Sequence, residues 1–284
     1  MFEMLLNPRK AERRPWELFF IGLFYASLSV LLVNWIFGQD VVLAKYSGIL
    51  IITFAVMFSM PFVYYTIRLE ELKDLRIEGN FRLVREHGKA LLCFLWLFLG
   101  FIAAFSFWYI FLGSPNNSRA QVETFCAINR PNSYEGCISQ YGITSKEPKG
   151  FVTSTEKIGM IFANNIYVLI FTIIFSLIFG AGGIFVLAWN ASVISAAVVI
   201  FSNSKIINIP LGMARYMIHG IPEIAAYFLG TLAGGIISLS IIKHEMKRER
   251  FWTILQDSLL LIIIAVVVLF LAAIVEVFIT PALF

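Results

Sequence analysis

The sequence predicts an all-α fold, a polytopic transmembrane helical bundle with seven spans. Its 284 residues have a mean hydropathy of +0.83 and only 14% charged side chains, unlike soluble globular domains. The apolar residues form long runs almost free of charge, and about 20 such residues cross a bilayer as a helix. The excess of Lys and Arg, a formal charge of +4, lies in short segments beside these runs. This pattern is typical of membrane proteins and gives no indication of nucleic-acid binding.

Six apolar runs are long enough to be spans, and we place them at residues 17–37, 45–67, 90–113, 158–187, 211–242 and 258–280. A seventh apolar segment, residues 190–201, is only about a dozen residues long. It is either a short fifth span or a re-entrant half-helix. We expect Asn190 to cap its N-terminus, because Asn is a preferred N-cap residue.

The distribution of basic residues predicts the topology. The segments 9–14, 68–89 and 243–250 each contain more Lys and Arg than Asp and Glu. They are therefore expected in the cytoplasm. Residues 114–157 then form an external loop, and segment 190–201 must cross if the sixth span is to end inside. The prediction is a multi-pass protein of the plasma membrane with a cytoplasmic N-terminus and an external C-terminus. A re-entrant segment would break this parity.

The chain is expected to contain two parts. Residues 1–79 comprise a basic tail and a two-span hairpin with a cytoplasmic helical extension, and residues 80–284 form a second membrane domain that includes the external loop 114–157. The extension over residues 68–89 is expected to break near Gly79 and Asn80. A solvated helical hairpin is favoured there over a surface that docks a partner.

Two cysteines, Cys126 and Cys137, flank a polar stretch of the external loop. An external location would permit a disulfide between them, and two free thiols are the alternative.

Ionisable residues at membrane depth mark the candidate functional site. Arg215, His219 and Glu223 follow one another at steps of four, so they share one stripe of the sixth span. Pro222 cannot donate to the carbonyl of Ile218, which leaves a backbone acceptor free beside His219. Such residues usually face a bundle interior, a cavity or a partner.

Helical rise suggests that further polar groups join this stripe. If the sixth span enters from outside near residue 211, Arg215 lies about 6 Å deep, His219 about 12 Å and Glu223 about 18 Å. The predicted cluster in the outer half of the bundle therefore contains Asn164, Asn165, Arg215, His219, Glu223 and Glu276. We expect an ion pair between Arg215 and Glu276, with His219 and Glu223 as a deeper reactive or proton-carrying pair. A buried network that only positions helices is the alternative.

No sequence feature predicts a catalytic residue, a metal or a cofactor. The other histidines, His87 and His244, fall on the cytoplasmic side, and there is no His-Glu-x-x-His run. Neither a Gly-x-Ser-x-Gly motif nor a phosphate-binding loop is present. The small-residue spacing of Gly230 and Gly234 predicts close helix packing, and we assign the same role to the glycines at 180–183 in the predicted fourth span.

Several short motifs, taken together in this order, resemble the stage II sporulation protein M family over roughly residues 80–284. They are residues 85–89, the run Phe-Ala-Asn-Asn-Ile at 162–166, the glycine-rich 179–183 leading to Asn190, His-Gly-Ile-Pro-Glu at 219–223, and residues 276–281. The resemblance implies a polytopic membrane protein. The name-giving member acts as an anchor and scaffold that assembles with cell-wall-degrading partners during engulfment of the forespore. Recurring polar positions of the family match Asn164, Asn165, His219, Glu223 and Glu276.

The chain departs from this family by two extra spans and a basic tail before Asn80, so the family's partner interface is not carried over. We expect a non-enzymatic scaffold or assembly factor. Its partners would be the lipid bilayer, other membrane or cell-envelope proteins, or further copies of the chain. The alternatives are a small transporter or permease that uses His219 and Glu223 as a proton or ion relay, and an intramembrane enzyme that uses the same residues.

Overall fold

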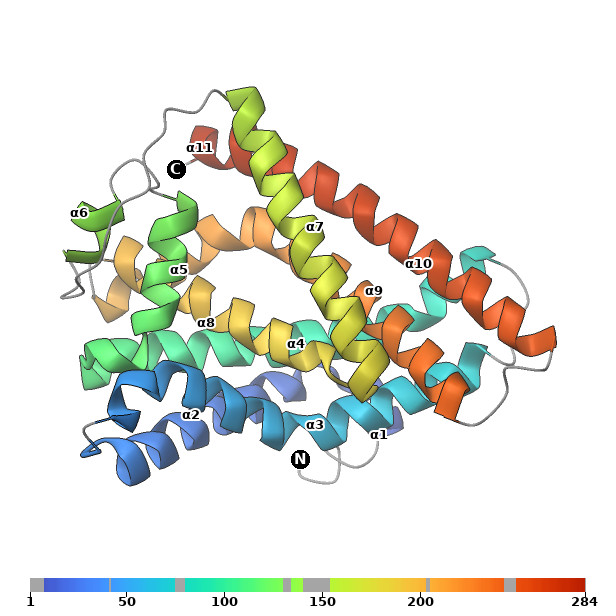
Figure 1. Cartoon of the computed structure of the whole chain (residues 1–284), viewed down its shortest axis with the longest axis horizontal. Coiled ribbons are helices and arrows are strands. Elements are labelled where there is room, and N and C mark those ends of the chain that lie inside the picture. Colours follow the sequence, from blue (N-terminus) through green and yellow to red (C-terminus); the bar gives the residue numbers. More distant parts are fainter. Residues whose placement is uncertain are drawn as a thin grey trace.

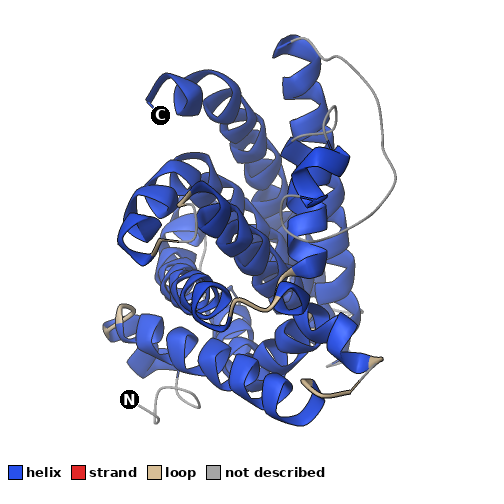
Figure 2. Cartoon of the chain, turned by 90° about the vertical axis from the view of Figure 1, so that its left-hand side faces the viewer, coloured by secondary structure: helices blue, strands red, loops and turns tan. Residues whose placement is uncertain are grey.

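The structure is a computed structural model that describes residues 8–40, 42–74, 80–129, 134–139, 154–202, 205–242 and 249–283. Within these ranges the chain forms helices joined by turns, and no strand occurs (Figure 2). Seven helices are long and apolar enough to cross a membrane. The predicted all-α bundle with seven spans is therefore confirmed.

The first three spans pack side by side (Figure 1). They are α2 (Glu17–Phe37), α3 (Ser47–Asp74) and α4 (Asn80–Leu112), preceded by the short α1 (Pro8–Arg13) and joined between α2 and α3 by η2 (Leu43–Tyr46). The apolar segment of α3 reaches Lys73, next to the end of the helix, whereas that of α4 starts at His87, well after the helix begins. Gly79, the predicted break, lies outside the described residues, and α4 begins at Asn80.

A close approach of α2 and α4 was not predicted. Gly22 and Gly100 face one another across these two helices, and a Cβ atom on either would collide with a backbone carbonyl of the other helix. Only glycine permits this spacing, which brings the first span against the third.

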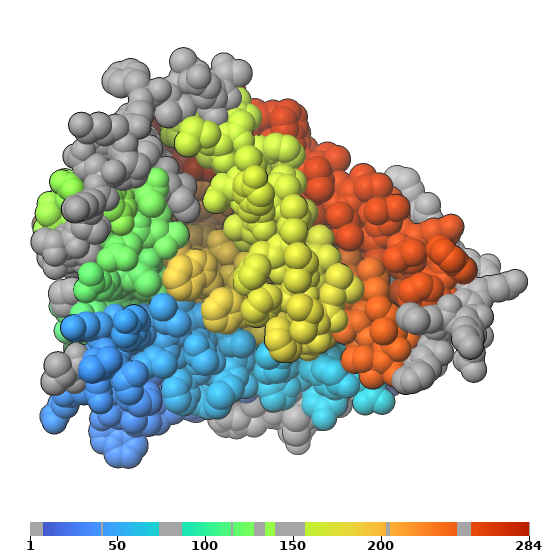
Figure 3. Space-filling model, in the orientation of Figure 1, coloured from blue at the N-terminus to red at the C-terminus, as the bar shows by residue number. Residues whose placement is uncertain are grey.

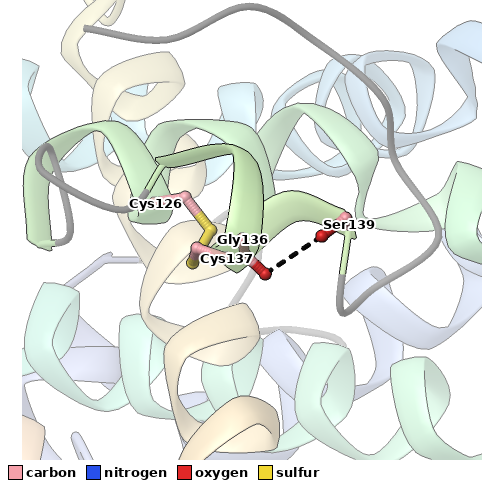
Figure 4. Close-up of a disulfide and its surroundings, with 4 residues drawn as sticks. All are labelled: Cys126, Gly136, Cys137 and Ser139. Atoms are coloured by element: carbon pink, nitrogen blue, oxygen red, sulfur yellow. Dashed lines mark hydrogen bonds between the residues drawn. A yellow bond between two sulfur atoms is a disulfide. The ribbon is translucent and has the colours of Figure 1, made fainter. Parts of the chain in front are cut away.

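The loop that was predicted to be external contains η3 (Pro115–Asn117), α5 (Arg119–Asn129) and α6 (Tyr134–Ser139). Cys126 of α5 and Cys137 of α6 form a disulfide, which confirms that prediction (Figure 4). Gln121 of α5 donates to the carbonyl of Gly48 (3.1 Å), which ties the loop to the start of α3.

The predicted boundary between the fourth and fifth spans is wrong. The fourth span, α7 (Ser154–Phe179), ends well before residue 187, and the fifth, α8 (Gly183–Phe201), is a continuous helix of 19 residues. Gly180 makes the turn with a φ of +67°, a left-handed conformation that favours glycine. Gly180 therefore separates two helices, whereas Gly183, the first residue of α8, packs closely against Thr231 of α9 and Ser176 of α7, as predicted for these glycines.

The predicted capping role of Asn190 is wrong for the same reason. This residue lies inside α8, where its side-chain amide donates to the carbonyl of Val186 (2.8 Å). With α8 starting at Gly183, the fifth span is long enough to cross a membrane.

The sixth span, α9 (Ile209–Ile242), is the centre of the bundle. It follows η5 (Ile206–Asn208), and 83% of its apolar window is buried, against 28% for α7. As predicted from their spacing, Gly230 and Gly234 pack closely, meeting Leu169 and the backbone of Ile173 on α7. The last span comprises α10 (Glu249–Ile274), the π-helical turn η7 (Val275–Ile279) and α11 (Thr280–Leu283).

Candidate functional site

The polar stripe of α9 lies between α7 and the end of the last span. Pro222 is accommodated within a continuous helix, and His219 and Glu223 are half-buried. Each side chain forms a hydrogen bond to another span, Glu223 to α7 and His219 to the last span.

Glu223 is bonded to α7. The amide of Asn165 donates to Glu223 Oε1 at 2.8 Å, and only 5% of Asn165 is exposed. Hydrogen bonds of this kind between polar side chains on different spans hold helices together in a membrane.

His219 is bonded to the last span. Its Nδ1 lies 3.1 Å from the hydroxyl of Thr280, which in turn donates to the carbonyl of Val275 at 3.3 Å. With the hydroxyl proton directed to Val275, Nδ1–H is the donor to Thr280 and Nε2 remains an acceptor. Thr280 was not among the predicted cluster residues. It stands four residues after Glu276, and that spacing was the available signal.

Glu276 lies on the π-helical turn, near enough to Glu223 for their charges to interact. The charge of Lys157, at the beginning of α7, acts on both Glu276 and His219. Lys157 is exposed and was not predicted to belong to the cluster. Tyr227 lies one turn beyond Glu223 and is only 1% exposed. Its hydroxyl interacts electrostatically with the carboxyl groups of Glu223 and Glu276.

The predicted ion pair between Arg215 and Glu276 is wrong. The Arg215 guanidinium lies 4.9 Å from the centre of the Phe201 ring, at the end of α8, in a cation–π contact. Lys157 is the cation whose charge acts on Glu276. Helical rise predicted the depth of Arg215, but the direction of its side chain depends on the neighbouring helix.

Asn164 lies at the edge of the cluster. Its amide donates a long hydrogen bond of 3.5 Å to Asn165, and the residue is exposed. With Asn190 it lines a pocket of about 530 Å³ between α7 and α8. In Figure 3 this side shows a depression between the green α5 and the yellow-green α7, with gold residues of α8 at its floor. His219 and Glu223 do not line this pocket.

A second buried polar network was missed by sequence reasoning. Lys73 Nζ donates to Glu12 Oε1 at 2.6 Å and to Glu70 Oε1 at 2.7 Å, and His87 Nδ1 lies 2.6 Å from Glu70 Oε2. Glu70 and His87 are fully buried. Burial raises the pKa of Glu12, against the lowering effect of the hydrogen bond from Lys73. The network fastens α1 to α3 and α4.

The described residues contain no group of three or more His, Cys, Asp or Glu side chains arranged to hold a metal ion. The α9 cluster can therefore be described by its pairs. Glu223 is bonded to an amide and His219 to a hydroxyl, and Glu276 interacts electrostatically with Glu223 and with Lys157.

A sequence model of the Stage II sporulation protein M family matches residues 90–281. The chain belongs to this family. The match contains all six predicted cluster residues, whereas α2 and α3 lie before it. Comparisons with curated proteins and with solved structures found no match. Family membership and seven apolar helices make this a multi-pass membrane protein of the Stage II sporulation protein M family.

Proposed function

We propose that this protein is a non-enzymatic membrane scaffold or assembly factor, in which the α9 cluster locks three spans into one rigid body. One observation carries the proposal. Asn165 of α7 and Thr280 of the last span bind Glu223 and His219, which are neighbours on the central helix. A lock between helices needs polar groups that are paired across spans, which is the arrangement of these two bonds.

We further propose that the N-terminus is cytoplasmic and the C-terminus external in the plasma membrane. The ends of α3 and α9 and the beginnings of α4 and α10 lie at the right of Figure 1, and basic residues flank them in the sequence. The disulfide-bonded α5 and α6 lie at the opposite end, as expected of an oxidising exterior. Seven crossings then separate the two termini.

The lock is tested by two substitutions of one residue. Glu223→Gln keeps an oxygen that can accept from Asn165, whereas Glu223→Ala removes it and leaves a buried amide without its partner. We expect Glu223→Ala to lower the free energy of unfolding in mixed micelles by about 1–3 kcal/mol, and Glu223→Gln to change it by less than about 0.5 kcal/mol. Asn164→Ala is the matched control, because Asn164 is the exposed neighbour of Asn165. Equal stability of the Ala and Gln variants would contradict the lock.

A second candidate function is proton or ion transport through the same residues. It is favoured by the proximity of Glu223 and Glu276, two acids at membrane depth. Proteoliposomes that contain the wild-type protein separate the two functions. A scaffold gives no proton flux above protein-free vesicles, whereas a transporter gives a flux that Glu223→Gln abolishes although the variant remains folded.

A further inference from the structure

A basic pocket opens at the end of the bundle where α1 packs against α3 and α4. Its volume is about 580 Å³. Its lining residues come from these three helices and are Arg9, Glu12, Arg13, Leu69, Lys73 and Lys89. The buried network of Glu12, Lys73 and Glu70 holds α1 against α3. The walls of the pocket are therefore fixed in position without a ligand.

The lining carries four cations and one carboxylate. The ammonium of Lys73 donates hydrogen bonds to both Glu12 and Glu70. Glu12, the single carboxylate of the lining, is therefore already paired. Arg9, Arg13 and Lys89 are exposed, and none has an ion pair within the part of the chain that the structure describes. Three cations therefore face one pocket without a direct ion pair to any carboxylate of the described residues.

The pocket lies at the level where a membrane meets water. Lys73 is the last residue of the second apolar span, and Lys89 follows two residues after the third begins at His87. Trp16, at the beginning of α2, is 51% exposed, as expected of the aromatic belt at a membrane interface. A ligand at this depth meets phosphate headgroups on one side and acyl chains on the other.

We propose that this pocket binds the phosphate headgroup of an anionic phospholipid from the leaflet that borders α1. The guanidinium groups of Arg9 and Arg13 suit bidentate bonds to phosphate oxygens, and Lys89 adds a third positive charge. Basic pockets beside transmembrane helices attract anionic headgroups in this way. A zwitterionic headgroup carries its own cation, which the three basic side chains repel. Leu69 provides an apolar wall beside the acyl chains.

The proposal is tested by native mass spectrometry of the full chain in detergent with equal amounts of phosphatidylglycerol and phosphatidylcholine. We expect the wild type to retain phosphatidylglycerol preferentially. Each cation removed, in Arg9→Gln, Arg13→Gln and Lys89→Gln, should lower this preference about fivefold, which corresponds to about 1 kcal/mol. Arg14→Gln is the matched control, because Arg14 is an exposed neighbour outside the pocket that pairs with Glu17. It should leave the preference unchanged.

Several results would overturn the proposal. They are equal retention of the two lipids by the wild type, an unchanged preference in the triple variant, and an equal loss in Arg14→Gln. If the triple variant fails to fold, the single Arg13→Gln variant decides. In a last experiment, inorganic phosphate at millimolar concentration competes with phosphatidylglycerol for the pocket. If it displaces phosphatidylglycerol completely, the pocket recognises a soluble anion and the lipid assignment is wrong.

Discussion

The two buried polar networks use opposite chemistry. In the network of Glu12, Glu70, Lys73 and His87, each acid contacts a nitrogen of a basic side chain at 2.6–2.7 Å. In the α9 cluster, the acid Glu223 accepts from an amide. The first network joins the short basic helix α1 to two helices, and the second joins three spans.

The difference indicates what each network contributes. A buried ion pair stabilises through its partners and becomes costly when one partner is removed, because a charge is left without compensation. A hydrogen bond between spans contributes less, because polar groups in a membrane find other partners when they separate. The network at α1 should therefore be the more sensitive to substitution, although it lies outside the region that the family shares.

The largest expected effect comes from Glu70→Ala. It removes the carboxylate that contacts both Lys73 and His87, and we expect the free energy of unfolding to fall by about 3 kcal/mol or more. Denaturant titration in mixed micelles measures this. Glu17→Ala, which breaks a pair with the largely exposed Arg14, should cost less than about 1 kcal/mol. A similar loss in the two variants would refute the contrast between buried and exposed pairs.

A smaller effect is expected at the other network. Thr280→Val keeps the shape of the side chain but removes the hydroxyl that contacts His219, and it should cost about 0.6 kcal/mol. The control is Thr53→Val, because the Thr53 hydroxyl bonds only to its own helix, at the carbonyl of Ile49. If Thr280→Val costs as much as Glu70→Ala in the same assay, the α9 cluster is the dominant lock and the comparison is reversed.

The smallest effect tests an exposed carboxylate that belongs to neither network. Backbone N–H groups of Leu43 and Val42 donate to Asp40, and these bonds hold its pKa below the ordinary value of 3.8. A lowered pKa in the folded protein gives stability that is present above the unfolded pKa and lost as the pH falls through the folded one. Melting temperatures measured between pH 5 and 2 should therefore fall more for the wild type than for Asp40→Ala. Identical pH profiles would show that these bonds contribute nothing.

The sequence predicted the helical membrane fold well because long apolar runs indicate spans and basic loops indicate the side of the membrane. It failed between α7 and α8, because the apolar pattern continues through the glycines and only the backbone conformation of Gly180 separates the helices. The spacing of His219 and Glu223 predicted their common stripe, and residue depth placed Asn165 near them. Depth could not predict the partner of Arg215, which depends on how α8 is rotated.

The buried network at α1 was not predicted for a different reason. Glu70, Lys73 and His87 occur in a segment of mixed charge, which composition alone describes as a solvated hairpin. Burial of such residues depends on α1, which covers them only after the chain has folded back on itself. Glu70 and Lys73 are neighbours on one helix, but their bonds to His87 and Glu12 join residues far apart in sequence and leave no local periodicity.

The length of α9 has a consequence for the surrounding bilayer. Its 34 residues extend about 51 Å, whereas the hydrocarbon core of a typical membrane is about 30 Å thick. A helix with this mismatch must incline or project into the headgroup region. Because α9 is also the most deeply packed span, a change in its inclination is transmitted to the helices around it. Lipids with longer or shorter acyl chains should therefore change the angles between spans, which makes bilayer thickness a physical control on the shape of this protein.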